Sequence, residues 1–368
     1  MNLSSRILSF LQFISFVSFS CYNVHSQITP KNIENSDQSI SAIIVFGDST
    51  VDPGNNNYIN TVFKSDFLPY GMDLPSHIPT GRFTNGKLVT DFIASYLGIK
   101  EYVPPYLNKS LSREELISGV SFASAASGYD PLTPQIDNVI PMTKQLEYFK
   151  EYKERLGQIM GNEKMESHIR NAVFFVSCGT NDFGVNYFNH PVRRTQFNVS
   201  DYQKFVIENT RKFLQGLLDL GALKIGVVGL PPIGCLPVLV TENSFSTFPQ
   251  RQCVESYSAV AKQYNLLLQN ELQTIQKTVA DSGVLMVYAD IYEPLLNLIK
   301  SPKNYGFEDW NKGCCGTGLV ETIFLCNPMS LVCPDPSKFI FWDSIHPTEK
   351  VYYLLFLELR ESTVDRLT

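Results

Sequence analysis

Three residues of this chain have the types and the spacing that acyl transfer by a serine nucleophile requires. Ser49 follows a short apolar run, and Asp343 precedes His346 by three positions in the stretch Phe-Trp-Asp-Ser-Ile-His-Pro. A serine hydroxyl attacks well only when a neighbouring base takes its proton, and histidine serves best as that base when a carboxylate fixes its tautomer. We therefore predict that Ser49 is the nucleophile, His346 the base and Asp343 the acid that orients the base.

The negative charge that develops on the substrate oxygen during acyl transfer needs hydrogen-bond donors. Removal of one such donor typically costs on the order of 10²- to 10³-fold in rate. The chain offers three candidates: the backbone N–H of Ser49, a backbone N–H from the small-residue loop 124–128, and the side-chain amide of Asn181. We predict that these groups form the oxyanion hole.

Each of these residues also has an ordinary structural use. Gly, Asp and Ser are common turn residues, so the Ser49 segment could be a plain turn in which Asp48 or Ser49 caps the next helix. Asn181 could likewise be a turn residue, and His346 could cap a helix beside a surface carboxylate. The catalytic interpretation depends on the presence of all these groups in one chain.

The elements that would position these residues alternate between buried strands and long helices. Apolar runs predict strands at 43–46, 119–123, 172–178, 224–230 and 284–288, and helical spacing predicts helices at 88–97 (with Thr84 or Asn85 as cap), 142–160, 202–220, 257–280 and from Pro347 to about 361. Strands that are joined through helices form parallel crossovers. We therefore predict a three-layer α/β/α, flavodoxin-like domain whose polar strand ends meet at the ligand-binding edge.

The composition and the charge limit the class of protein and its partners. The chain has 368 residues, of which 44% are hydrophobic and 18% charged, which is typical of a globular protein. We found no linker, charge run or repeat that would divide it, so we predict a single domain over residues 27–368. The formal charge is −6 and Lys and Arg are scattered, so we expect no nucleic-acid partner. We also expect a monomer.

Residues 1–26 have the pattern of a secretory signal peptide. Arg6 precedes the apolar stretch 7–17, and the segment ending at Ser26 offers small side chains where a signal peptidase cleaves. The apolar run is shorter than the roughly 18 residues of a membrane span, so we predict a secreted, extracellular protein without an integral anchor. In that setting the sequons at Asn108 and Asn198 predict glycosylation on surface loops.

The cysteines that remain after cleavage predict disulfides. An odd number in an oxidising compartment indicates three bridges and one free thiol, and we expect Cys178 to be free because it lies in an apolar run. The other six are Cys235, Cys253, Cys314, Cys315, Cys326 and Cys333. The last four could form a zinc site, but they lack a CxxC pair, so disulfides are the better prediction.

Taken in order, the motifs resemble the four sequence blocks of the plant GDSL esterase/lipases, which are SGNH hydrolases. The blocks cover nearly the whole mature chain and read Phe46-Gly-Asp-Ser-x-x-Asp-x-Gly-Asn-Asn56, Gly119-Val-Ser-Phe-Ala-Ser-Ala-Ala-Ser-Gly128, Gly179-Thr-Asn-Asp182 and Asp343-Ser-Ile-His-Pro347. Segments 232–237 and 313–316 also match that family. Segment 128–134 is similar to the extracellular-lipase subgroup.

This resemblance implies a role for each candidate residue. Ser49 would be the nucleophile, His346 the base and Asp343 its orienting acid, while Asn181 and a glycine of the second block would complete the oxyanion hole. The position that aligns with that glycine is Ala126 in this chain. Its backbone N–H can still donate, but a positive φ at this position would cost energy for alanine.

We therefore expect a secreted carboxylic ester hydrolase that cleaves esters, such as acyl lipids, through an acyl-enzyme on Ser49. Motifs for metal or phosphate binding and a Gly-x-Ser-x-Gly elbow do not occur, so we expect neither a metal nor a cofactor and do not expect an α/β-hydrolase. A carbohydrate O-deacetylase or an acyltransferase would use the same site, and a non-catalytic secreted binding protein is the alternative from another class. Residues after Asn181 could line an acyl site, with core packing as the alternative use: Phe183, Val185, Tyr187 and Phe188.

Overall fold

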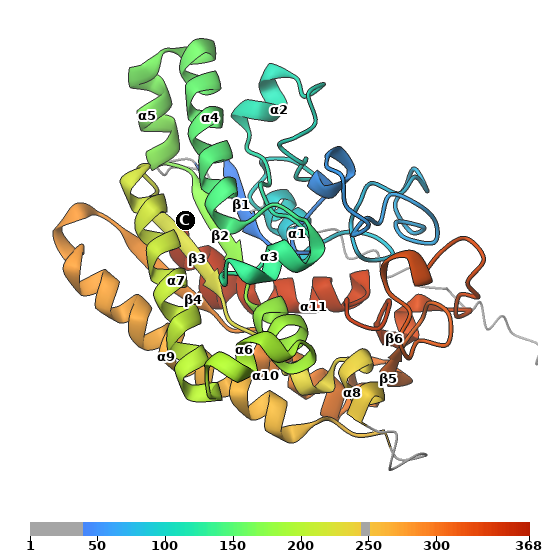
Figure 1. Cartoon of the computed structure of the whole chain (residues 1–368). Coiled ribbons are helices and arrows are strands. Elements are labelled where there is room, and N and C mark those ends of the chain that lie inside the picture. Colours follow the sequence, from blue (N-terminus) through green and yellow to red (C-terminus); the bar gives the residue numbers. More distant parts are fainter. Residues whose placement is uncertain (1–39, 244–250) are drawn as a thin grey trace, which may run out of the picture.

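A four-stranded parallel sheet runs through the middle of the molecule (Figure 1). This computed structural model describes residues 40–243 and 251–368, so the predicted signal peptide lies outside the described residues. The strands lie in chain order and are β1 (Ile43–Gly47), β2 (Val173–Ser177), β3 (Lys224–Val228) and β4 (Leu285–Ala289). All residues of β1 and β2 are buried, which explains why these strands read as continuous apolar runs.

The predicted strand 119–123 lies parallel to β1 on its outer side. The N–H of Phe122 donates to Val45 O at 2.7 Å and the N–H of Val45 donates to Val120 O at 3.1 Å. Only an isolated bridge forms, between Val45 and Ser121. With this segment counted second along the chain, the spatial order becomes 2-1-3-4-5, as in flavodoxin-like folds. The predicted α/β class with a parallel sheet is confirmed.

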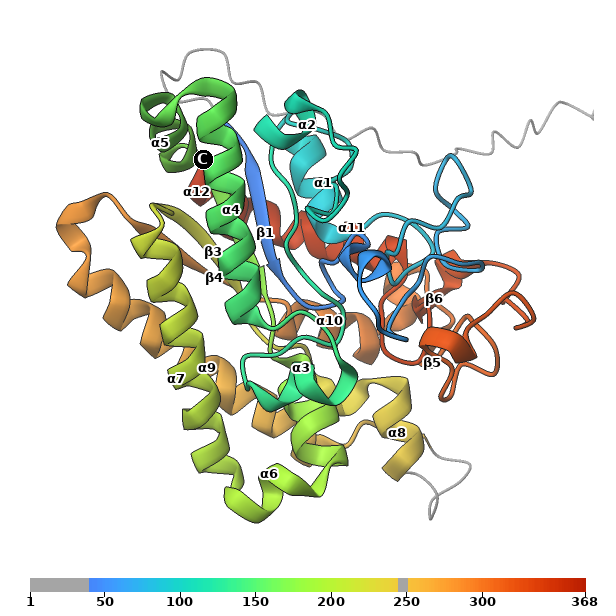
Figure 2. The same cartoon turned by 45° about the horizontal axis from the view of Figure 1, so that its top comes forward.

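Helices cover both faces of the sheet, as Figures 1 and 2 show. Ile44 and Phe46 belong to the apolar cluster under α4, α7 and α9, whereas Ile43 and Val45 belong to the cluster under α1 and α11. This alternation gives each face of β1 its own core. The helix bounds are α1 (Val89–Tyr96), α2 (Arg113–Ile117), α3 (Leu132–Asp137), α4 (Met142–Met160), α5 (Asn162–Arg170), α6 (Pro191–Gln196), α7 (Val199–Asp219), α8 (Pro237–Asn243), α9 (Glu255–Thr278), α10 (Tyr292–Lys300), α11 (Glu349–Leu359) and α12 (Asp365–Leu367).

The last long helix begins two residues later than its sequence predicts. Thr348 is the N-cap of α11, and Pro347 instead bridges to Phe341 and accepts a hydrogen bond from Thr84 Oγ1 at 3.0 Å. The proline therefore belongs to the loop before the helix. Asn85 Oδ1 accepts from the N–H of Glu349 at 2.9 Å.

Thr84 and Asn85 thus contact the start of α11 and do not cap α1, contrary to the sequence prediction. Helix α1 begins at Val89 after Leu88, whose N–H donates to Asp91 Oδ2 at 2.9 Å. The Asp91 carboxylate also forms a buried ion pair with Arg82, with an N–O distance of 2.8 Å. A carboxylate in the first turn therefore takes the capping role that the sequence assigned to the preceding loop.

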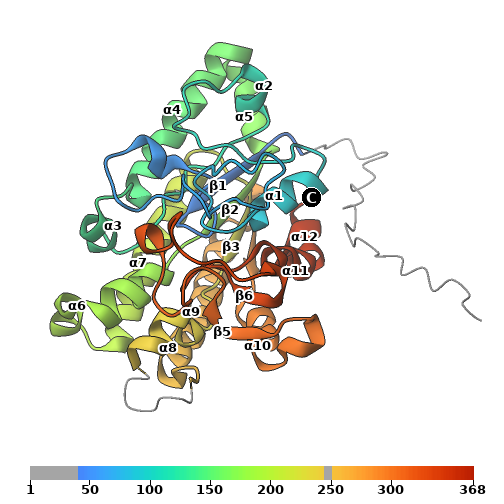
Figure 3. The same cartoon turned by 90° about the vertical axis from the view of Figure 1, so that its right-hand side faces the viewer.

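A small parallel pair of strands, β5 (Asp309–Gly313) and β6 (Phe339–Phe341), precedes α11. Figure 3 shows this pair among the loops at the carboxyl ends of the main strands. Among the cysteines that the structure describes, three disulfides form, Cys235–Cys253, Cys314–Cys333 and Cys315–Cys326, and the buried Cys178 is free. The predicted number of bridges and the predicted free cysteine are both confirmed. Within the described ranges, no helix has the length and apolar character needed to cross a bilayer.

Gly119 tests the close contact between segment 119–123 and β1. Its φ is +99°, and a Cβ at this position would overlap the carbonyl oxygen of Ile43. A backbone oxygen in a sheet cannot move aside as a flexible side chain can. We therefore expect Gly119→Ala to lower the free energy of unfolding by about 3 kcal/mol or more. Gly98 is the control, because its φ is also positive, at +68°, but a Cβ at this position would meet no heavy atom within 4 Å. Gly98→Ala should cost about 1 kcal/mol. If urea unfolding gave equal losses of free energy for the two variants, the close contact between Gly119 and Ile43 would be contradicted.

Candidate active site

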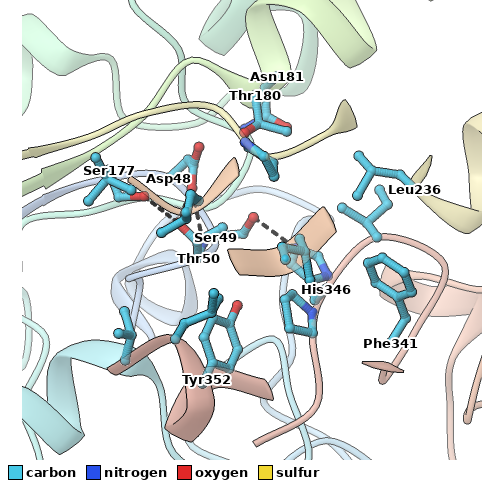
Figure 4. A pocket seen from close by; sticks show the side chains of 18 of the residues that line it. Asp48, Ser49, Thr50, Ser177, Thr180, Asn181, Leu236, Phe341, His346 and Tyr352 are labelled. Carbon is cyan, nitrogen blue, oxygen red and sulfur yellow. Dashed lines mark hydrogen bonds between the residues drawn. The ribbon is translucent and has the colours of Figure 1, made fainter. Parts of the chain in front are cut away.

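Ser49 and His346 meet at the carboxyl end of β1 (Figure 4). Ser49 Oγ lies 2.8 Å from His346 Nε2, although the two residues are 297 positions apart. On the other side of the ring, His346 Nδ1 lies 2.7 Å from Asp343 Oδ2 and 3.0 Å from Oδ1. All three side chains are buried. The structure therefore brings the three predicted residues together in the geometry that lets an imidazole take a serine proton.

Asp343 and His346 share one tight loop between β6 and α11. The N–H of Trp342 donates to His346 O at 2.7 Å, which closes the loop. Asp343 Oδ1 accepts from the backbone N–H of Ile345 at 2.8 Å and of His346 at 2.7 Å. Aspartate commonly bonds to backbone groups ahead of it in such turns. A spacing of three is therefore enough to place the carboxylate beside the ring.

The Asp343 carboxylate is ionised despite its complete burial. Burial acts to raise its pKa, but the charge of His346 and hydrogen bonds from the ring and from two backbone N–H groups outweigh burial, so the pKa lies below its ordinary value. An ionised carboxylate accepts the Nδ1 proton, which leaves Nε2 to accept the proton of Ser49. The electrostatics thus agree with the orientation of the ring.

Tyr70 and Thr322 also hold this carboxylate, and the sequence did not single them out. Tyr70 Oη donates to Asp343 Oδ2 at 2.8 Å and accepts from the N–H of Ile323 at 3.0 Å, and Thr322 Oγ1 donates to the same Oδ2 at 3.2 Å. Burial and the charge of Asp343 raise the pKa of Tyr70 well above its ordinary value, so Tyr70 stays a neutral donor. Tyr70 lies in a Pro/Gly-rich loop, whose sequence indicates only turns.

Disulfides hold the Thr322 segment against the acid. The Cys315–Cys326 bridge closes a loop around Thr322, and the Cys314–Cys333 bridge closes a larger loop around the first. The N–H of Ser344, next to Asp343, donates to Glu321 O at 2.8 Å. The crosslinked segment therefore touches the acid loop through backbone and side chain alike.

Asn181 and the loop 124–128 lie side by side, and Asn181 lines the pocket that contains Ser49. Asn181 follows β2, and its Nδ2 donates to Ser127 O at 2.9 Å. An amide nitrogen carries two hydrogens, so the second remains for a ligand. Asn181 lines the same pocket as Ser49 and His346, and Figure 4 places it above Ser49. The predicted amide donor and the predicted loop are therefore joined by a direct hydrogen bond.

Ala126 has the positive φ that the sequence marked as costly, with a value of +66°. Its side chain is buried, and within residues 40–243 and 251–368 its N–H donates no hydrogen bond. Ala126 does not line the pocket around Ser49, and it connects to Asn181 only through its neighbour Ser127. The N–H of Ala126 is thus unpaired, but Ala126, unlike Asn181, does not contribute to the pocket wall beside Ser49.

The remaining polar residues of the first block hold the loop 124–128 in place. Asp52 Oδ2 accepts from the N–H of Ala125 at 2.9 Å, and Asn56 Nδ2 donates to Ala125 O at 3.1 Å. Ser124 Oγ donates to Asn56 Oδ1 at 2.5 Å. Burial raises the pKa of Asp52 to about 6. These contacts explain why the motif extends beyond Ser49.

Asp182 fastens the same region from the Asn181 side. Its carboxylate accepts from the N–H of Tyr129 at 2.8 Å, from the N–H of Asp130 at 3.1 Å and from Thr133 Oγ1 at 2.5 Å. Burial raises the pKa of Asp182 to about 7. Because Asp182 is adjacent to Asn181, this network ties the amide donor to the segment that follows the loop 124–128.

A pocket lies beside Ser49, and the space in it, open solvent at its mouth included, is about 730 Å³. Its polar groups are mainly those near Ser49. The rest of its wall is formed largely by apolar side chains from α1, the end of β3 and the segment after it, the start of α10, β6 with the loop after it, and α11: Val89, Val228, Pro231, Leu236, Ile291, Leu295, Phe341, Ile345, Pro347, Tyr352, Leu355 and Leu359. The sequence did not identify these walls, because they come from five separate segments that look like ordinary core.

The four residues that the sequence offered as an acyl site do not line this pocket. Phe183 and Tyr187 pack against Tyr202, with ring centroids 5.5 Å and 4.7 Å from it, and Phe188 stacks on Tyr257. Val185 also lies outside the pocket wall. Core packing, the alternative use of these residues, is what the structure shows for Phe183, Tyr187 and Phe188, and none of the four lines the pocket beside Ser49.

Comparison with known proteins agrees with the sequence blocks. The family model described as GDSL-like Lipase/Acylhydrolase matches residues 43–359. The Arabidopsis thaliana protein GDSL esterase/lipase At5g45960 is 58% identical over 322 residues, which cover 88% of this chain and 86% of that protein. Another from the same plant, GDSL esterase/lipase At1g06990, is 44% identical over 331 residues, which cover 90% and 91% of the two chains.

Substitution of Ala126 tests whether its backbone N–H or its side chain matters. Ala126→Gly keeps the N–H and relieves about 1–2 kcal/mol of left-handed strain, offset by about 0.4–1 kcal/mol of added unfolded-state entropy. We expect kcat with a short acyl ester to be unchanged and the free energy of unfolding to rise slightly. Ala125→Gly, whose N–H is bound by Asp52, is the control and should only destabilise. A large fall in kcat for Ala126→Gly would assign the role to the methyl group.

Substitution of Tyr70 tests whether its hydrogen bond to Asp343 positions the acid. Tyr70→Phe removes a hydrogen bond to an ionised group, worth about 1.5–3 kcal/mol, so we expect kcat to fall roughly 10- to 100-fold. KM should change little because Tyr70 does not line the pocket. Loss of this donor raises the pKa of Asp343, so activity should disappear at a higher pH as the solution is acidified.

The matched control is Tyr58→Phe, because Tyr58 is 49% exposed. We expect this variant to keep the wild-type kcat and the wild-type pH profile. If Tyr70→Phe also kept both, Tyr70 would have no part in positioning the acid.

Proposed function

Because this chain belongs to the family of GDSL-like lipases and acylhydrolases and is a carboxylic ester hydrolase, we propose that it cleaves acyl lipid esters through an acyl-enzyme on Ser49. The observation that carries this proposal is the 2.8 Å contact between Ser49 Oγ and His346 Nε2 beside a largely apolar pocket. The contact supplies an activated nucleophile, and the pocket supplies a place for an apolar acyl chain.

In the first half of the reaction, Ser49 Oγ attacks the ester carbonyl carbon while His346 Nε2 takes the hydroxyl proton. Asp343 stabilises the imidazolium that results. The carbonyl oxygen becomes an oxyanion, which accepts hydrogen bonds from the N–H of Ser49, the N–H of Ala126 and Nδ2 of Asn181. The C–O bond to the alcohol then breaks, and His346 returns the proton to the departing oxygen.

In the second half, water replaces the alcohol. His346 takes a proton from the water, and the hydroxide attacks the acyl carbon bonded to Ser49. The second tetrahedral intermediate uses the same donors, and its collapse releases the acid as His346 protonates Ser49 Oγ. The balance is one ester and one water consumed, and one acid and one alcohol formed.

The wall of the pocket supports an acyl lipid over an acetylated sugar. A sugar carries many hydroxyls and needs polar side chains to bind them, whereas most of this wall is apolar. An acyltransferase would use the same chemistry with an alcohol in place of water. The intact set of acid, base and nucleophile makes a binding protein without turnover the less supported alternative.

We also propose that the chain is secreted as a single domain. The signal-like residues 1–26 and three disulfides in the described part of the chain support an oxidising destination. Asn198 is exposed at the start of α7, where its Oδ1 accepts from the N–H of Asp201 at 3.0 Å. Its Nδ2 donates to Asp201 Oδ2 at 2.8 Å, and we expect glycans here and at Asn108.

Replacement of the nucleophile tests the proposed mechanism. We expect Ser49→Ala to fold with unchanged stability, to lose at least about 10³-fold in kcat and to lose labelling by a fluorophosphonate probe. Ser76→Ala, at an exposed serine, should label and turn over as wild type. Undiminished labelling or turnover of a triacylglycerol by Ser49→Ala would refute the role of Ser49.

A further inference from the structure

The pocket wall contains a buried hydroxyl without a partner. Tyr352, on α11, is 2% exposed and lines the pocket together with Ser49 and His346. Its Oη has no hydrogen-bond partner among residues 40–243 and 251–368. Figure 4 shows the ring below Ser49 and Thr50, with the hydroxyl pointing toward them. A buried hydroxyl without a partner costs about 1–3 kcal/mol, so its presence calls for a partner that the polypeptide does not supply.

In the described part of the chain, no hydrogen bond joins the Tyr352 hydroxyl to the hydroxyls of Ser49 and Thr50. Thr50 Oγ1 is already shared between Asp48 Oδ1 and Ser177 Oγ, each at 2.8 Å, and Ser49 Oγ is bound to His346. The Tyr352 hydroxyl is a neutral donor, because burial and then the charge of Asp48 and Asp343 raise its pKa well above the ordinary value. A neutral donor in an apolar wall recognises an oxygen atom on the ligand.

The surroundings of Tyr352 show which part of a ligand would carry that oxygen. Leu355 and Leu359 follow on the same helix and line the same pocket. Residues 352 and 359 are seven positions apart, which corresponds to roughly 10 Å along a helix. An acyl chain that is bonded to Ser49 can therefore pass Tyr352 first and lay its aliphatic remainder along the two leucines.

We propose that the Tyr352 hydroxyl binds an oxygen close to the carbonyl of the acyl chain, so that the enzyme prefers esters of hydroxyacyl chains to esters of plain chains of equal length. This inference rests on the proposed function. A plain chain would bury methylene groups against Oη and leave it without a partner, whereas a 2- or 3-hydroxyl would accept a hydrogen bond from it. Sites that contain a buried polar group discriminate against ligands that cannot pair with it.

The test compares ethyl 3-hydroxyoctanoate and ethyl 2-hydroxyoctanoate with ethyl octanoate. For wild type, we expect kcat/KM to be roughly tenfold higher for at least one hydroxy ester than for the plain ester. Tyr352→Phe should remove this preference, so that kcat/KM falls more for the hydroxy ester than for ethyl octanoate. Tyr257→Phe, at a tyrosine outside the pocket, should keep the preference. Absence of a preference in wild type, or equal losses on all three esters in Tyr352→Phe, would overturn the proposal.

A binding measurement separates this inference from the proposed function. In the Ser49→Ala background, 3-hydroxyoctanoate should raise Tm more than octanoate does, and the additional Tyr352→Phe change should remove the difference. If the proposed function were wrong and this inference right, the wild type would be inactive and would not be labelled by the fluorophosphonate. The Tyr352-dependent difference in Tm would still be seen in the Ser49→Ala background. An equal Tm shift with both acids would overturn the inference even if the wild type hydrolyses all the esters.

Discussion

The buried charge of Asp343 is the constraint on which the site depends. A carboxylate without solvent is costly unless it is paired and hydrogen-bonded, and this one is satisfied from several parts of the chain. His346 and Ile345 supply local donors, while Tyr70 and Thr322 supply distant ones. Because Asp343 needs these donors, the loop that contains Tyr70, the disulfide-linked segment that contains Thr322 and the loop before α11 all contact its carboxylate. The imidazole is then oriented toward Ser49 as a result of the same contacts.

Two further buried carboxylates, Asp52 and Asp182, organise the segments that carry the oxyanion-hole candidates in the same way. Asp52 binds the loop 124–128 through the N–H of Ala125, and Asp182 binds the segment after that loop. Burial raises the pKa of both groups, which shows that their partners do not fully offset desolvation. The loop with the strained Ala126 is therefore held by its neighbours rather than by its own preference.

Sequence reasoning found the strands, the long helices and the residues around Ser49 because each has a local signal. Apolar runs mark buried strands, and a serine, an asparagine and an Asp-x-x-His pair at strand or helix ends mark chemistry. The rest arises from tertiary contacts: Tyr70 and Thr322 have no pattern, and the pocket wall consists of aliphatic residues that resemble any core. The start of α11 was predicted two residues too early for a similar reason, because the tertiary contact between Pro347 and Thr84 keeps the proline in the loop before the helix.

The Cys315–Cys326 bridge has a practical consequence for anyone who produces this protein. The main sheet contains none of the bridged cysteines, so its strands can pair in a reducing cytoplasm, yet the segment that presents Thr322 to Asp343 would then lack its crosslink. Material from such a host can be well folded by circular dichroism and still poorly active. Expression through an oxidising secretory route, with a thiol count that finds one free cysteine, is the appropriate quality standard.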